Sequence, residues 1–160
     1  MGSIIAYVGE GPRYWPLIER AIDLAAGRKA ALILYDVDAA SAFSSPLPTI
    51  WSSEGLADQF GDRLDLEQLE KAGREELRDR VRHARDRGVE AWGWLPQKRD
   101  AAALGEYAAK QGASLVIIPK QLEKHGLLDA LKGRPTAEEI VEETDSPVLE
   151  VDLEHRAAKT

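Results

Sequence analysis

The chain has 160 residues, 44% of them hydrophobic, which is enough for one domain to bury its own core. Its 28 acidic and 21 basic residues give a net charge of −7, which repels polyanions, so we expect no nucleic acid and no acidic membrane surface as partner. The absence of cysteine excludes disulfides, thiolate catalysis and thiolate-bound zinc, and the three histidines lack metal-ligand spacing.

Membrane insertion and export are not expected from the sequence. No stretch approaches the ~20 consecutive apolar residues of a membrane span. The opening residues, MGSIIAYVGEG, lack a basic region followed by a long apolar run. We therefore expect a soluble, cytoplasmic protein.

Short apolar runs rich in β-branched residues alternate with helical patterns from the start of the chain. Residues 3–8 and 30–37 predict the first two strands. Between them, residues 16–27 predict a helix, with Pro16 in its first turn and Gly27 as its stop.

A long stretch, 38–63, follows and predicts a loop or lid, because prolines, glycines and serines interrupt its apolar residues. After it comes the strongest helical pattern, which predicts one helix that ends at Gly88; its apolar face is formed by Leu66, Leu69, Gly73, Leu77, Val81 and Ala84. The arginines of this helix alternate with acidic residues, and we interpret them as a salt-bridged solvent face.

Residues 89–95 predict the third strand, with Trp92 and Trp94 on one face. We expect these two rings to pack against a helix rather than to stack a ligand. Asp100 then caps a predicted helix over 101–111, which Gly112 closes.

The fourth strand is predicted over 114–119. Thr136 and Glu139 form a capping box ahead of the last helix, and Pro147 precedes the last strand, residues 148–151. Strands that alternate with helices predict a parallel sheet with helices on both faces. We expect a single domain over residues 1–152 and a flexible tail over 153–160.

Two stretches carry a resemblance to a known family. The run GVEAWGWLPQKRDAAALGEYAAKQGASLVIIP and the closing DSPVLEVD are similar to the corresponding parts of universal stress proteins, and the similarity extends over residues 3 to 152. It implies a three-layer α/β/α sandwich around a five-stranded parallel sheet of order 3-2-1-4-5, of the adenine-nucleotide α-hydrolase type. It also implies no firmly shared enzymatic activity and a homodimer paired through the last strand, whose residues are Val148, Leu149, Glu150 and Val151.

Nucleotide-binding members of that family carry an Asp at the end of the first strand and the pattern G-x2-G-x9-G-[ST] after the fourth. The glycines allow successive backbone N–H groups to surround the phosphates. In this chain Gly9 stands in place of the Asp, and Gly133 is followed by Arg134 and Pro135, which has no N–H to donate. Neither register of the pattern recovers the first two glycines, whose places are taken by Pro119 and Leu122 or by Lys120 and Glu123.

These departures favour a dimeric stress-response or regulatory module that does not bind ATP in the family's usual way and needs no cofactor. An alternative is an adenine-nucleotide binder in which Lys120, Lys132 and Arg134 replace the glycine nest. A second alternative is a small-molecule enzyme of the same fold that uses Asp36 or Asp38. An unknown protein partner also remains open.

The candidate site residues fall into two groups near the carboxyl ends of the strands, where open α/β sheets hold their ligands. The candidate cleft consists of Val8, Gly9, Asp36, Pro119, Lys120, Lys132, Gly133, Arg134 and Thr136. The candidate lid consists of Tyr14, Trp15 and Trp51, which either hold an apolar ligand or partner or merely cover the sheet. We expect no catalytic residue and no metal ligand.

Overall fold

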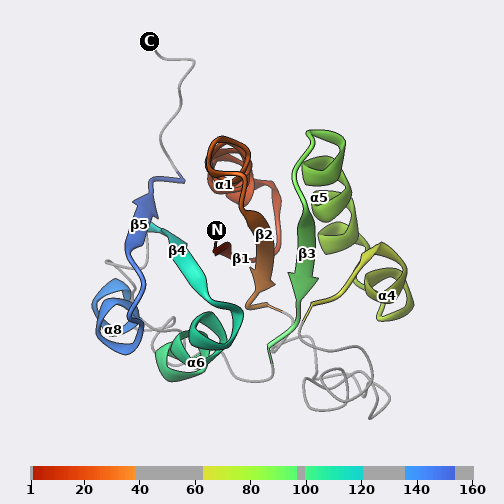
Figure 1. The fold of residues 1–160 in the computed structure, drawn as a ribbon. Coiled ribbons are helices and arrows are strands. Elements are labelled where there is room, and N and C mark those ends of the chain that lie inside the picture. The colour runs from red at the N-terminus through yellow and green to blue at the C-terminus, as the bar shows by residue number, and fades with distance from the viewer. Residues whose placement is uncertain (1, 39–62, 97–99, 121–135, 154–160) are drawn as a thin grey trace.

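The structure, a computed structural model, describes residues 2–38, 63–96, 100–120 and 136–153. A parallel sheet of five strands, in the order β3-β2-β1-β4-β5, forms its centre (Figure 1). The strands are β1 (Ser3–Val8), β2 (Ala31–Asp36), β3 (Ala91–Trp94), β4 (Ala113–Pro119) and β5 (Val148–Val151). This confirms the strand order that the family resemblance implies.

Helices cover both faces of the sheet. They are η1 (Pro12–Tyr14), α1 (Trp15–Arg28), α4 (Leu66–Lys71), α5 (Glu75–Asp86), α6 (Ala101–Gln111) and α8 (Ala137–Glu143). Figure 1 shows α1 and α5 on one face and α6 and α8 on the other. This is the three-layer α/β/α sandwich that the sequence predicts.

The core lies on both faces of the central strand. All six residues of β1 are buried, as expected for a strand covered by helices on both sides. The core also continues to Leu153, which is buried, so the packed part of the chain extends one residue beyond the predicted domain end.

The prediction of one helix that begins near Leu66 and ends at Gly88 is wrong, because the structure has two helices there. Asp65 forms a capping box with Gln68 at the start of α4, and Gly73 adopts φ 76° between α4 and α5. This left-handed conformation is available to glycine at little cost and ends the first helix. The apolar spacing continues across the break because both helices turn their apolar faces to the same sheet.

The predicted stop of the first helix at Gly27 is also wrong. Helix α1 runs through Gly27 to Arg28, and Lys29 ends it with φ 54°. The N–H of Lys29 donates to the carbonyls of Ala25 and Ala26, so backbone bonding fixes the left-handed residue here despite its side chain.

The indole rings of Trp92 and Trp94 in β3 pack against different side chains. Trp94 is buried and stacks on Tyr107 of α6, with ring centroids 5.5 Å apart and planes at 10°. The guanidinium of Arg85 lies 5.0 Å from the ring centroid of Trp92. Both rings therefore pack against helix residues, as the sequence analysis expected.

The outer edge of β3 is covered. Leu64 and Gly93 exchange two backbone hydrogen bonds of 2.9 Å in an isolated antiparallel bridge. Arg85 donates its Nε–H to the carbonyl of Ala91 at 2.9 Å. These contacts satisfy backbone groups of β3 that face away from β2, so this edge is closed to further strand pairing.

Candidate functional site

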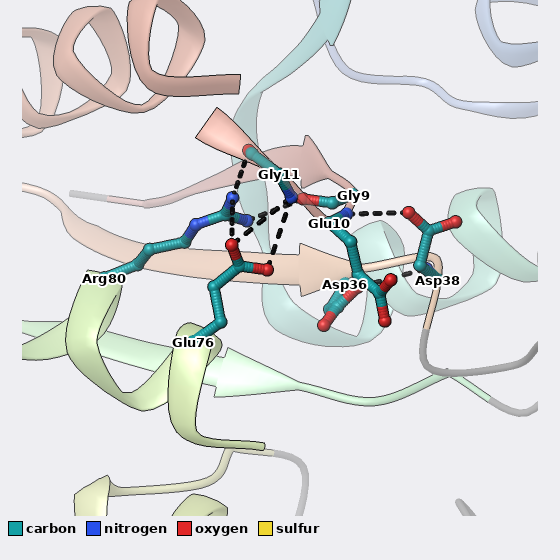
Figure 2. Close-up of polar contacts among 7 residues, drawn as sticks. All are labelled: Gly9, Glu10, Gly11, Asp36, Asp38, Glu76 and Arg80. Atoms are coloured by element: carbon teal, nitrogen blue, oxygen red, sulfur yellow. Dashed lines mark hydrogen bonds and ion pairs between the residues drawn. The ribbon is translucent and has the colours of Figure 1, made fainter. Parts of the chain in front are cut away.

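The candidate site lies at the carboxyl ends of β1 and β2. The two strands pair in register from Ser3 with Ala31 to Val8 with Asp36, so the residues that follow them emerge side by side. Figure 2 shows the turn 9–11 after β1 beside Asp36 and Asp38 from the end of β2, with α5 approaching from below.

The carboxylate of Asp38 occupies the space in front of Gly9. Its Oδ2 accepts a hydrogen bond from the N–H of Glu10 at 2.7 Å. A Cβ atom on Gly9 would lie 2.5 Å from that same oxygen and 2.8 Å from the hydroxyl of Tyr14. Any side chain at position 9 would therefore collide with these groups, which explains physically why glycine stands there.

Asp36 is a buried carboxyl with an acidic neighbour. Its side chain accepts a 3.0 Å hydrogen bond from the N–H of Asp38, and the residue is only 7% exposed. Burial, and secondly the negative charge of Asp38, raise the pKa of Asp36 to about 6. The hydrogen bond from the backbone of Asp38 and the positive charges of Arg80 and Arg74 act in the opposite direction.

Arg80 of α5 fixes the turn after β1. It is 2% exposed, and its guanidinium donates to the carbonyls of Gly9 at 2.7 Å and Gly11 at 2.6 Å. Glu76, one turn earlier on α5, lies 3.5 Å from the guanidinium and accepts from the N–H of Gly11 at 3.3 Å. Helix α5 thus holds the turn 9–11 through the carbonyls of Gly9 and Gly11 and the N–H of Gly11 (Figure 2).

The N–H groups of Glu10 and Gly11 in this turn are already bonded to carboxylates of the chain itself. Asp38 accepts from Glu10, and Glu76 accepts from Gly11. Backbone N–H groups at the start of a helix are common partners of bound anions. An anionic ligand at this turn would have to displace a carboxylate to reach either donor.

The structure brings only part of the predicted cleft together. Val8 is buried in the core, and Gly9 and Asp36 meet at the ends of neighbouring strands. Pro119 is the buried last residue of β4, and the exposed Lys120 follows it. Three further positions, Lys132, Gly133 and Arg134, lie outside the described residues.

Thr136 has a local structural contact. Its hydroxyl accepts from the N–H of Glu139 at 3.1 Å, and the Glu139 side chain accepts from the N–H of Thr136 at 2.9 Å. This is the predicted capping box of α8, which is confirmed.

Two of the three candidate lid aromatics pack onto the protein. Tyr14 is only 4% exposed, and its hydroxyl lies against the turn at Gly9. The ring of Trp15 meets His83 edge to face, with centroids 5.2 Å apart. Trp51 lies outside the described residues.

The role of Arg80 was not predicted from the sequence, because the mixed charges of its helix indicated a solvent face. The missed signal is helical position: Arg80 lies between Leu77 and Ala84 on the side of α5 that faces the sheet, and all three are buried. A cation on an apolar stripe indicates a buried partner, here the carbonyls of Gly9 and Gly11.

Within the described ranges, no group of three or more His, Asp or Glu side chains is arranged to hold a metal ion. None of the helices in those ranges has the length and apolar character needed to cross a membrane.

Comparison with known proteins finds similarity in structure. No family model matches the chain, and no curated protein matches it. A universal stress protein from Archaeoglobus fulgidus in complex with dAMP has a TM-score of 0.56 at 14% identity, covering 93% of this chain and 96% of that one. A protein of the universal stress protein family from Burkholderia pseudomallei has a TM-score of 0.56 at 20% identity, covering 93% and 95%.

A third solved structure, a universal stress protein in complex with cAMP, has a TM-score of 0.54 at 17% identity and covers 96% of this chain and 99% of that one. Structural similarity at sequence identities this low is evidence for the fold alone. The chain therefore has the fold of the universal stress proteins, as its sequence resemblance predicts.

Proposed function

We propose that the chain is a dimeric regulatory module of the universal stress protein type that does not bind ATP in the usual way of such proteins. The observation that carries this proposal is the position of the Asp38 carboxylate, which fills the space in front of Gly9 and accepts from the N–H of Glu10. The proposal assigns no catalytic step and no cofactor.

Electrostatics supports the same conclusion. A phosphate at the turn 9–11 would need backbone N–H groups as hydrogen-bond donors. The carboxylates of Asp38 and Glu76 already accept from those of Glu10 and Gly11. Two like charges about 4 Å apart repel by about 4 kcal/mol at an effective dielectric constant of about 20. Asp36, with a pKa of about 6, adds a further negative charge at neutral pH.

Adenine-nucleotide binding is the second candidate, because two of the similar structures are complexes with dAMP and with cAMP. Lys120 is exposed directly after β4, the strand that pairs with β1 on the side away from β2. If this second candidate is correct, a lysine or arginine side chain contacts the phosphate in place of the glycine-rich backbone that nucleotide-binding members of the family use.

A thermal melt separates the two candidates. The purified protein is heated with and without millimolar ATP and magnesium, and again with AMP and with cAMP. A ligand at a hundredfold excess over its dissociation constant stabilises the folded state by about 2.7 kcal/mol. We expect no shift with any of the three. A shift that Lys120→Ala abolishes would replace the first candidate by the second.

The dimer is proposed from the edges of the sheet. The edge at β3 is covered by Leu64 and Arg85, which leaves β5 as the edge for strand pairing with a second copy. The carbonyl of Pro147 accepts from Val116 of β4, so the N–H of the next residue, Val148, points away from β4.

Sedimentation equilibrium tests the dimer. We expect a dimer for the wild-type chain and a monomer for Val148→Pro, which removes that outward N–H group. Proline is tolerated on an edge strand when its N–H side faces outward, so the variant should keep its fold. A monomeric wild-type chain at micromolar concentration would rule the dimer out and leave the nucleotide experiment unaffected.

A further inference from the structure

The turn 9–11 has the parts of a binding site for a small oxyanion, and a carboxylate of the chain itself occupies it. Oδ2 of Asp38 lies 2.7 Å from the N–H of Glu10, a length typical of a hydrogen bond to a charged acceptor. Asp38 is 9% exposed, so little water reaches this contact. A free oxyanion and a carboxylate use a backbone N–H group in the same way, so the occupied position suits either of them.

Gly9 supplies the space for that carboxylate. Gly11 has a φ of 102°, which favours glycine, but the φ of Gly9 is not in the left-handed region. Glycine is needed at position 9 because an added Cβ atom would lie 2.5 Å from Oδ2 of Asp38 and 2.8 Å from the hydroxyl of Tyr14. The turn therefore leaves room for a group of carboxylate size, and Asp38 fills that room.

Arg80 supplies a buried positive charge at the same turn. Figure 2 shows Arg80 and Asp38 on opposite sides of the turn. Arg80 is 2% exposed, and its Nε–H is buried without a hydrogen-bond partner in the described part of the chain. Its ion-pair partner Glu76 lies 3.5 Å away and is 51% exposed, so solvent screens that pair. A buried cation with a screened partner favours an anion in the neighbouring space.

We propose that the Asp38 carboxylate is an internal ligand of the turn 9–11: it closes a site for a small oxyanion of one negative charge, and its removal opens that site to a free anion. The contact is autoinhibitory. A group tethered beside its own site acts at a high effective concentration, so a free anion of the same chemistry does not displace it. This inference rests on the proposed function, because it names the contact that keeps anionic ligands out of the cleft.

Charge decides which anion fits the opened site. Asp36 is buried beside Asp38, and the negative charge of Asp38 contributes to the raised pKa of Asp36. A free monoanion in place of the Asp38 carboxylate leaves the charge of the site unchanged, whereas a second negative charge adds repulsion. Without any anion, the N–H of Glu10 loses the acceptor that Asp38 supplies. Formate therefore fits the opened site better than inorganic phosphate does at neutral pH.

Thermal melts of the full chain and two variants test the proposal. Asp38→Ala removes the carboxylate, and Asp38→Asn is the matched control, because its amide oxygen still accepts from Glu10 and fills the same space. Each protein is heated in sodium formate, in inorganic phosphate and in sodium chloride of equal ionic strength. Formate at tenfold its dissociation constant should raise the melting temperature of Asp38→Ala by about 3 to 6 °C over chloride.

The wild-type chain and Asp38→Asn should show only the general effect of each salt on folded proteins. Phosphate should stabilise Asp38→Ala less than formate does. Backbone amide NMR of Asp38→Ala, titrated with formate, then locates the anion. The largest shift is expected at Glu10, and no comparable shift at Lys120, an exposed cation after β4 where an anion could bind without the turn.

Three results would overturn the proposal. The first is no formate-specific stabilisation of Asp38→Ala, the second is equal stabilisation of the wild-type chain or of Asp38→Asn, and the third is amide shifts centred away from the turn. If Asp38→Ala is unfolded in chloride, its folding in formate is the expected result, and a chain that stays unfolded in formate counts against the proposal. The proposed function fails on a different result, a shift of the wild-type chain with ATP.

Discussion

The buried side chain of Asp36 destabilises the folded chain when it is ionised. Replacing Asp36 by asparagine removes this charge. The pKa of Asp36 rises from 3.8 to about 6, because burial removes the ionised carboxylate from water and because the negative charge of Asp38 repels that carboxylate. Each pKa unit corresponds to about 1.36 kcal/mol, so above pH 6 the ionised group lowers the free energy of unfolding by at most about 3 kcal/mol.

The sign follows from proton binding. Between about pH 4 and pH 6 the folded chain keeps the Asp36 proton while the unfolded chain has lost it, so stability falls as pH rises through this window. Below this window Asp36 is protonated in both states and carries no such penalty. Asparagine resembles the protonated acid, and its oxygen still accepts the N–H of Asp38.

Urea unfolding of the wild-type chain and Asp36→Asn, followed by tryptophan fluorescence at several pH values, measures the difference directly. We expect little difference near pH 4 and a gain for the variant of up to about 3 kcal/mol at pH 7.5, or about 6 to 12 °C in melting temperature. Taking the difference between the two chains cancels the titration of every group that does not interact with Asp36. A difference that stays constant from pH 4 to pH 7.5 would refute the reasoning.

Two glycine positions give further predictions. Gly9→Ala places a methyl group 2.5 Å from the Asp38 carboxylate and should cost about 1 to 3 kcal/mol of unfolding free energy; combined with Asp38→Ala, the loss should be smaller than the sum of the two single losses, measured by urea titration. Gly105→Ala brings a methyl group into the carbonyl oxygen of Glu143 and forces α6 and α8 apart, so its melting temperature should fall. Gly27→Ala in α1 is the control, since nothing lies within 4 Å of the added atom and the melting temperature should rise slightly. Equal effects at positions 27 and 105 would contradict the close approach of α6 and α8.

The fold was predictable because its signals are local and repeated. Each strand is a short apolar run, and Asp100, Gly112 and Thr136 mark helix ends with a cap or a left-handed residue. The order of strands and helices, together with the resemblance, then predicts the sheet. The break at Gly73 was missed because a left-handed glycine interrupts the backbone without interrupting the apolar period.

The site was less predictable because its contacts join residues far apart in the sequence. The replacement of the expected Asp by Gly9 is visible in the sequence, but what fills the space is not. Asp38 lies 28 positions from Glu10, and Arg80 lies 71 positions from Gly9. Only the side-by-side ends of β1 and β2 and the approach of α5 bring these groups together.

The covered edge of β3 has a consequence for the size of any assembly. A sheet with two open edges can pair at both, and copies then add without end into a fibre. In the described part of the chain, Leu64 and Arg85 close the edge at β3. If two copies pair through β5 as proposed, neither copy then offers its β3 edge to a third, so strand pairing of this kind ends at a dimer rather than a fibre.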